Sequence, residues 1–178
     1  IACEKSRVTA KLLNRYCIKT KMTHYHDHNA KKALPRLIKI IEHGGAVALV
    51  SDAGMPCISD PGQLLVHECI QRGYSVTAAP GPNAAITGLV LSGLPTNRFH
   101  FMGFLNPKRN ARIKELSELV AIKASLIFYE SPKRLADSLD DIVKLGIYNP
   151  ILKNTNIFKD KVKNIKKIIK ELKKLKNG

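Results

Sequence analysis

The chain has 178 residues, of which 44% are hydrophobic, so it can bury a core and is not globally disordered. Its apolar runs are shorter than the roughly 20 residues that span a bilayer, and its first residues lack the basic-then-apolar pattern of a secretory signal, so we expect a cytoplasmic chain without a membrane partner. The formal net charge of +16 favours a polyanionic partner such as nucleic acid.

Half of that charge lies in the last segment. Residues 151–178 hold ten lysines against Asp160 and Glu171. Such a lysine-rich run is typical of the solvated face of a helix, so the total charge overstates the evidence for nucleic acid.

The apolar pattern of the first 95 residues alternates between strands and helices. Residues 1–3 are typical of the end of a buried strand, from which we expect that the sequence starts inside a domain. The spacing predicts helices at 8–16, 30–43, 63–72 and 83–92, and strands at 21–25, 46–50 and 74–79. Strands that alternate with helices through short connections predict a parallel, right-handed α/β unit.

The pattern changes near Pro95, where we place a domain boundary. Strands are predicted at 99–104 and 125–130, and helices at 109–120 and from Pro132 onward. The sequence thus predicts an α/β fold with a parallel sheet in a first domain, 1–95, and a partial, mixed α/β second domain, 96–147. Residues 148–178 are predicted to form a Lys-rich amphipathic tail.

Two loops rich in glycine and proline follow predicted strands: VSDAGMPCISDPG at 50–62 and APGPNA at 79–84. Ligands of open parallel sheets bind beyond the carboxyl ends of the strands, where glycine allows close approach and proline fixes the loop. A purely structural alternative is a pair of tight turns. The first loop carries Asp52 and Asp60 and lacks a phosphate-binding pattern, which favours a ligand that is uncharged or zwitterionic where it touches the loop.

Four segments resemble a known family. VALVSDAGMPCISDPG at 47–62, APGPNAAITGLVLSGLP at 79–95, FMGFL at 101–105 and LIFYESPKRL at 126–135 resemble the ribosomal RNA cytidine 2′-O-methyltransferases of the tetrapyrrole methylase superfamily. The resemblance implies a two-domain α/β fold, a homodimer, and S-adenosylmethionine as cofactor between the domains. Relative to that family we expect a truncated start, a divergent end, and EKSR at 4–7 in place of EDTR.

The resemblance also implies the cofactor-binding residues. The methionine end would lie against the first loop, a second wall would come from the second loop, and the adenine side would come from the second domain. These residues are Asp52, Ala53, Gly54, Met55 and Pro56, then Gly81, Pro82 and Asn83, and finally Tyr129 and Glu130.

Transfer of a methyl group to a ribose hydroxyl depends mainly on geometry and partly on a base that relieves the hydroxyl of its proton. The candidate acids are Asp52, Asp60 and Glu130, none of which the sequence singles out. Glu130 has an alternative role, because it immediately precedes a predicted helix and could cap it.

Three histidines, His24, His26 and His28, alternate around Asp27 in the run THYHDHNA. Their spacing superficially suggests a metal site, but we expect no metal and favour a loop-surface role. A position for His28 and Asn29 at the substrate mouth is the alternative.

Basic residues and phenylalanines interleave in the second domain. Phosphate contact by the basic residues and stacking of bases on Phe99, Phe101 or Phe104 are both open, while the alternation of the phenylalanines favours a buried face. The candidate RNA-binding residues are Arg98, Lys108, Arg109, Arg112, Lys133 and Arg134.

Three functions are compatible with these features. The first is 2′-O-methylation of a cytidine ribose in small-subunit ribosomal RNA, and the second is methylation of a tetrapyrrole or another small molecule. The third is a degenerate or truncated remnant without catalysis. The DAGMP loop and the YESPKR segment favour the first.

Overall fold

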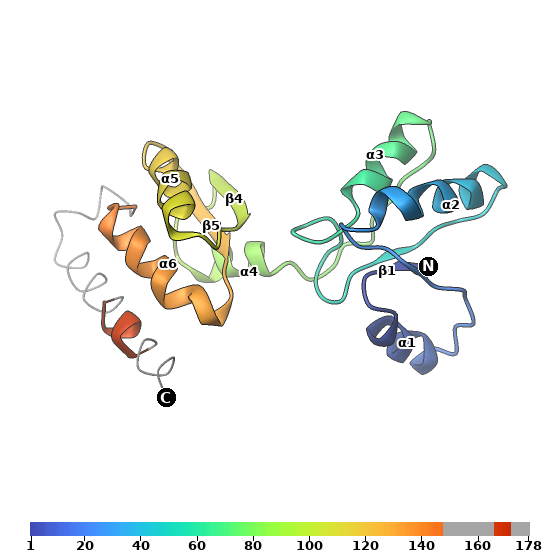
Figure 1. The fold of residues 1–178 in the computed structure, drawn as a ribbon, viewed down its shortest axis with the longest axis horizontal. Helices are drawn as coiled ribbons and strands as arrows, with labels where there is room; N and C mark the ends of the chain where they lie inside the picture. Colours follow the sequence, from blue (N-terminus) through green and yellow to red (C-terminus); the bar gives the residue numbers. More distant parts are fainter. Residues whose placement is uncertain (148–165, 172–178) are drawn as a thin grey trace. The chain divides into compact units, whose positions relative to one another are not determined.

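The computed structural model describes residues 1–147 and 166–171. Contacts divide the chain into two compact units, Ile1–Ala84 and Ala85–Gly178, called unit 1 and unit 2 below (Figure 1). This division precedes the predicted boundary near Pro95. The tail predicted at 148–178 lies outside the described residues except for 166–171, which are helical.

Unit 1 contains a small parallel sheet. Its central strand, β1 (Ala2–Cys3), lies between β2 (Thr23–His24) and β3 (Leu49–Val50), and both pairings are parallel. Both residues of β1 are fully buried, as its apolar sequence predicts. The parallel arrangement predicted for this part of the chain is therefore confirmed.

Three helices complete unit 1: α1 (Ser6–Arg15), α2 (Ala30–Glu42) and α3 (Gln63–Gln71). The apolar faces of α2 and α3 meet in a core that includes Leu37 and Leu65. Gly44, with φ of 78°, follows the end of α2, because glycine adopts this left-handed conformation without the penalty of a Cβ.

The strand predicted at 74–79 is wrong. The structure places no strand there, residues 75–79 are exposed, and Val76 has an exposed fraction of 46%. A strand needs a partner and a buried face, and no described strand pairs with this segment. The strand predicted at 46–50 is also shorter than expected, since only Leu49–Val50 pair with β1.

Unit 2 begins within α4 (Ala84–Leu91) and continues with β4 (Phe99–Phe104), α5 (Arg109–Leu119), β5 (Ser125–Tyr129) and α6 (Pro132–Lys144). β4 and β5 are parallel neighbours, so α5 is the crossover that a parallel pair requires. Leu105, Leu116 and Leu119 form the buried core of unit 2. Both units are thus α/β, as predicted.

No helix among residues 1–147 and 166–171 is both long enough and apolar enough to cross a membrane.

Candidate functional site

The loop that follows β3 has a strained, well-defined backbone. Cys57 and Ser59 have positive φ values, 70° and 57°, although neither is glycine. The Ser51 hydroxyl lies 3.2 Å from the carbonyl oxygen of Ala53 and 3.1 Å from that of Gly54, and it donates to this pair. Strain of this kind concentrates at functional sites, because surrounding structure must maintain it.

The two signature loops meet within unit 1. Gly54 has φ of 75°, and a Cβ built on it would lie 3.7 Å from the carbonyl oxygen of Pro82. The loop at 50–62 therefore adjoins the loop at 79–84, although no strand precedes the second loop. Asp52, Ala53, Met55 and Pro56 lie on the first loop, and Gly81 and Asn83 on the second.

Asp52 forms an ion pair that the sequence analysis missed. Lys5 Nζ lies 2.6 Å from Asp52 Oδ2 and 3.9 Å from Glu4 Oε1. The other oxygen, Asp52 Oδ1, is buried and has no hydrogen-bond partner among the described residues. The hydrogen bond to Asp52 is the largest cause that raises the pKa of Lys5.

Asp60 is a second carboxylate on the first loop, and it has acidic neighbours. Partial burial is the largest cause that raises the pKa of Asp60, and the charges of Glu4 and Asp52 raise it further. A hydrogen bond from Ser51 acts in the opposite direction. Asp60 therefore holds a proton more readily than an exposed aspartate does.

Glu130 and Tyr129 belong to unit 2. Glu130 Oε1 accepts from the backbone N–H of Ser131 at 2.7 Å and pairs with Arg134 Nη2 at 2.8 Å. Its Oε2 accepts from the buried Ser138 hydroxyl at 2.6 Å. Only 6% of the Glu130 side chain is exposed, and it contacts the first residues of α6, but the N-cap of this helix is Ser131 and no side chain of the described residues caps it. The capping role raised for Glu130 by the sequence is therefore wrong.

Aromatic packing accounts for much of β4. The ring of Tyr129 lies 5.0 Å from that of Phe101 and 5.6 Å from that of Phe104, measured between centroids. Phe99 and Phe104 are nonetheless 46% and 54% exposed. The buried face predicted from the alternation of the phenylalanines is thus incomplete.

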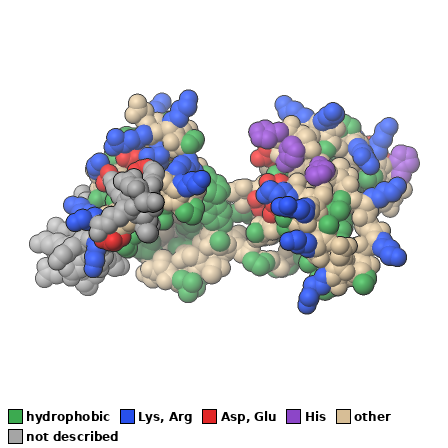
Figure 2. All heavy atoms as spheres, turned by 60° about the horizontal axis from the view of Figure 1, so that its bottom comes forward, with side chains coloured by type: hydrophobic (Ala, Val, Ile, Leu, Met, Phe, Trp, Pro, Cys, Tyr) green, Lys and Arg blue, Asp and Glu red, His purple; other side chains and the backbone are tan. Residues whose placement is uncertain are grey.

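The predicted RNA-binding cations differ in exposure. Arg98, Lys108, Arg109 and Lys133 are exposed, and Arg134 is partly exposed. On the face shown in Figure 2, Lys and Arg side chains are scattered over both units and do not gather in one patch.

Arg112 does not fit the RNA-binding prediction. It is 3% exposed and donates to Asp141 Oδ2 from Nε at 3.0 Å and from Nη2 at 2.7 Å. A buried, paired guanidinium is not available to a phosphate, so Arg112 is a structural residue of unit 2.

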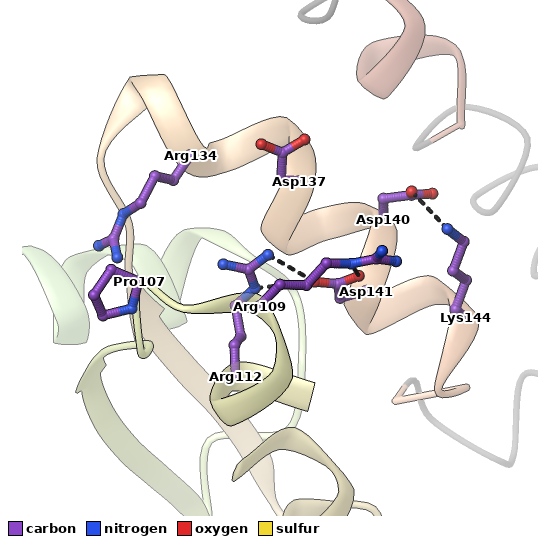
Figure 3. Close-up of a pocket in the computed structure, with 8 residues that line it drawn as sticks. All are labelled: Pro107, Arg109, Arg112, Arg134, Asp137, Asp140, Asp141 and Lys144. Carbon is purple, nitrogen blue, oxygen red and sulfur yellow. Dashed lines mark hydrogen bonds and ion pairs between the residues drawn. The ribbon is translucent and has the colours of Figure 1, made fainter. Parts of the chain in front are cut away.

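A polar pocket of about 450 Å³ lies beside this ion pair. Four cationic and three acidic side chains line it together with Pro107 (Figure 3). Arg109 and Arg112 converge on Asp141 in this view, and Lys144 reaches Asp140 at 2.9 Å. The charges of the pocket are largely paired with one another, which leaves little attraction for an anion.

The histidine run begins in β2, where His24 is exposed. His28 is exposed as well, while His26 is partly buried and its Nδ1 has no hydrogen-bond partner among the described residues. His24 Nε2 is 3.0 Å from the Ser6 hydroxyl, and the rings of His26 and His28 are 6.0 Å apart. Within residues 1–147 and 166–171, no group of three His, Cys, Asp or Glu side chains is placed to hold a metal ion.

Comparisons with known proteins point to one family. The sequence profile of the tetrapyrrole (corrin/porphyrin) methylases matches residues 1–175. Proteins named ribosomal RNA small subunit methyltransferase I are 52% identical over 143 residues in Halalkalibacterium halodurans, 49% over 144 in Mesorhizobium japonicum and 41% over 145 in Thermotoga maritima. These matches cover 80%, 81% and 82% of this chain but 50%, 49% and 65% of those proteins. The chain thus spans about half the length of the first two relatives.

Proposed function

The chain belongs to the tetrapyrrole methylase family, and we propose that it is an S-adenosylmethionine-dependent methyltransferase for a cytidine 2′-hydroxyl in small-subunit ribosomal RNA. The name that its relatives carry supports this substrate class. The observation that carries the proposal is the meeting of the two loops at Gly54 and Pro82, on the loop that also holds the mostly buried carboxylate of Asp52.

The residues of unit 1 fit the amino-acid end of this cofactor. Oδ2 is the oxygen of Asp52 that a ligand could reach, and an ammonium group there would supply donors together with the opposite charge. Gly54 permits close approach of the loop backbone, and neighbouring Ala53, Met55 and Pro56 would line the methionine chain. Gly81, Pro82 and Asn83 would form the second wall.

Tyr129 and Glu130 stay the residues proposed for contact with the adenine, on the family resemblance alone. The Glu130 carboxylate is occupied by Ser131, Arg134 and Ser138, so its backbone is the part available to a ligand. A backbone contact of Glu130 with the adenine would not make its side chain a catalytic acid.

The chemistry asks little of the protein beyond positioning. Bound S-adenosylmethionine supplies an electrophilic methyl group, and the chain must hold the ribose hydroxyl in line with it and accept its proton. Asp60 suits the second task best, since its pKa is raised and no cation pairs with it among the described residues. Asp52 is engaged by Lys5 and Glu130 by Arg134.

Ribosomal RNA would be the partner, held through phosphates by the exposed cations of unit 2. A homodimer and a cytoplasmic location belong to the same proposal and rest on the family resemblance. Light scattering after size-exclusion chromatography tests the dimer.

Calorimetric titration with S-adenosylmethionine tests the proposal. We expect binding, and we expect Asp52→Ala to weaken it while Glu42→Ala, which removes a surface carboxylate from α2, leaves it unchanged. Absence of binding at high micromolar cofactor would refute both methylase functions for this chain, on RNA and on a small molecule. If the cofactor binds, methyl transfer to undermethylated small ribosomal subunits separates an RNA methylase from a small-molecule methylase and from an inactive remnant.

A further inference from the structure

The ion pair between Lys5 and Asp52 follows from the register of the unit 1 sheet. Cys3 of β1 is paired with Val50 of β3 in parallel. Lys5 lies two residues beyond Cys3, and Asp52 lies two residues beyond Val50. The two side chains therefore leave the same edge of the sheet side by side, and their charged atoms approach to 2.6 Å.

This pairing occupies the part of Asp52 that a ligand could reach. Oδ1 is buried, while Oδ2 is held by the Lys5 ammonium group. Only 20% of the Asp52 side chain is exposed, whereas 64% of the Lys5 side chain is exposed. A cationic group that approaches Asp52 from solvent thus meets the position that Lys5 occupies.

Lys5 is chemically equivalent to the group that it would exclude. Its ammonium and the α-ammonium of an amino-acid ligand carry the same charge and offer the same number of donors. Because a carboxylate binds either group through charge-assisted hydrogen bonds, the two compete for Asp52.

We propose that Lys5 is an internal competitor for the ammonium group of the cofactor, and that it sets the affinity of the site for ligands with a zwitterionic amino-acid end. This inference rests on the proposed function. The competition is incomplete, since exposed ion pairs are weak and Lys5 can leave Asp52 at small cost. Lys5 therefore tunes ligand affinity without closing the site.

Calorimetry on the full chain with two nucleosides tests the inference. S-adenosylmethionine carries the amino-acid end, and 5′-methylthioadenosine lacks it. Lys5→Met removes the ammonium group but keeps a long apolar stem, Lys5→Arg keeps the positive charge, and Lys11→Met removes an exposed lysine from α1.

We expect Lys5→Met to bind S-adenosylmethionine about two- to fivefold more tightly than the parent chain does. Its affinity for 5′-methylthioadenosine should be unchanged, which also shows that the variant is folded. Lys5→Arg and Lys11→Met should bind both nucleosides as the parent does.

Equal or weaker binding of S-adenosylmethionine to Lys5→Met would overturn the inference, and weaker binding would mean that Lys5 contacts the ligand. An equal gain for both nucleosides would overturn it too, because the effect would then not depend on the amino-acid end. If the parent binds S-adenosylmethionine and Asp52→Ala weakens it, the proposed function survives either of these results. If neither the parent nor Lys5→Met binds either nucleoside, both proposals fail together.

Discussion

Arg112 and Asp141 form a buried ion pair that joins α5 to α6, with the guanidinium donating two hydrogen bonds to Asp141 Oδ2. Their side chains are 4% and 2% exposed. Removing one partner of such a buried pair is strongly destabilising, because it leaves an uncompensated charge in the interior.

We therefore expect Arg112→Met to lower the free energy of unfolding by about 3–5 kcal/mol, measured by urea denaturation. Arg109 also contacts Asp141, at 3.2 Å, but 61% of its side chain is exposed. Arg109→Met is the matched control and should cost about 0–1 kcal/mol. Similar losses for the two variants would show that burial does not determine the strength of this pair.

Three glycines differ in backbone conformation and in the space available to a Cβ, so substituting each by alanine distinguishes backbone strain from steric collision. Gly62 has φ of 146°, and a Cβ there would collide with Leu49 Cδ2 and lie 2.6 Å from Cys57 Sγ. Gly73 has φ of 74° but open space around it, and Gly88 lies in a helix with no atom within 4 Å of a built Cβ.

We expect Gly62→Ala to cost about 1–3 kcal/mol, Gly73→Ala about 1 kcal/mol, and Gly88→Ala to gain about 0.5–1 kcal/mol. Thermal denaturation of the three variants gives the order. If Gly62→Ala were as stable as Gly73→Ala, the loop after β3 would be less tightly packed than its contacts indicate.

Asp60 should make the stability of unit 1 depend on pH. Its pKa is raised in the folded state, chiefly by burial and then by Glu4 and Asp52. The folded chain therefore binds this proton more tightly than the unfolded chain does, so the stabilising effect is full below the unfolded pKa of about 3.9 and is lost as pH rises through the folded value.

Asp60→Asn removes this dependence, since the amide is neutral at every pH. We expect the variant to be more stable than the parent at pH 7, with the advantage shrinking toward pH 4. Melting temperatures at both values test this. Glu118→Gln, which removes an exposed carboxylate from α5, corrects for the change in net charge, and an advantage that grew toward pH 4 would contradict the sign.

Glu130 should behave as a structural residue. Ser138→Ala removes the donor to Glu130 Oε2, and we expect a loss of about 1.5–3 kcal/mol, because hydrogen bonds to charged groups are strong. Glu130→Gln should also destabilise the chain while leaving cofactor affinity nearly unchanged. A fully stable but inactive Glu130→Gln variant would instead identify Glu130 as a catalytic acid.

Exposed cations of unit 2 should contribute to RNA affinity through phosphates. The double change Lys108→Ala and Lys133→Ala is expected to weaken binding of a small-subunit RNA fragment at low salt. The slope of log affinity against log salt should fall in magnitude by about two, one for each phosphate contact. Lys123→Ala removes an exposed lysine from the same unit as the control, and an equal effect would indicate non-specific charge.

Helices were predictable because their pattern is local. The apolar stripe at 30–43 and the glycines that follow define α2 without reference to the rest of the chain. The prediction of a strand at 74–79 was wrong because a strand needs a partner elsewhere in the chain, and the local alternation of residues does not identify that partner.

Two charged pairs were partly predictable from sequence patterns. Arg112 shares a helical stripe with Leu116 and Leu119, at spacings of four and seven, and all three are buried. Lys5 and Asp52 each follow an apolar strand by two residues, so parallel pairing brings them together. The partner of Arg112 was beyond reach, since it depends on how α6 packs against α5.

The order of the strands in unit 1 also has a consequence for how the chain folds. β1 is central, but its partners begin only at Thr23 and Leu49, so every pairing of this sheet is non-local. Contacts of this kind form slowly, because closing the long intervening segment costs conformational entropy before the strands can pair. β3 leads directly into the loop at 50–62, so the position of that loop depends on the pairing of β3 with β1, which spans 47 residues of sequence.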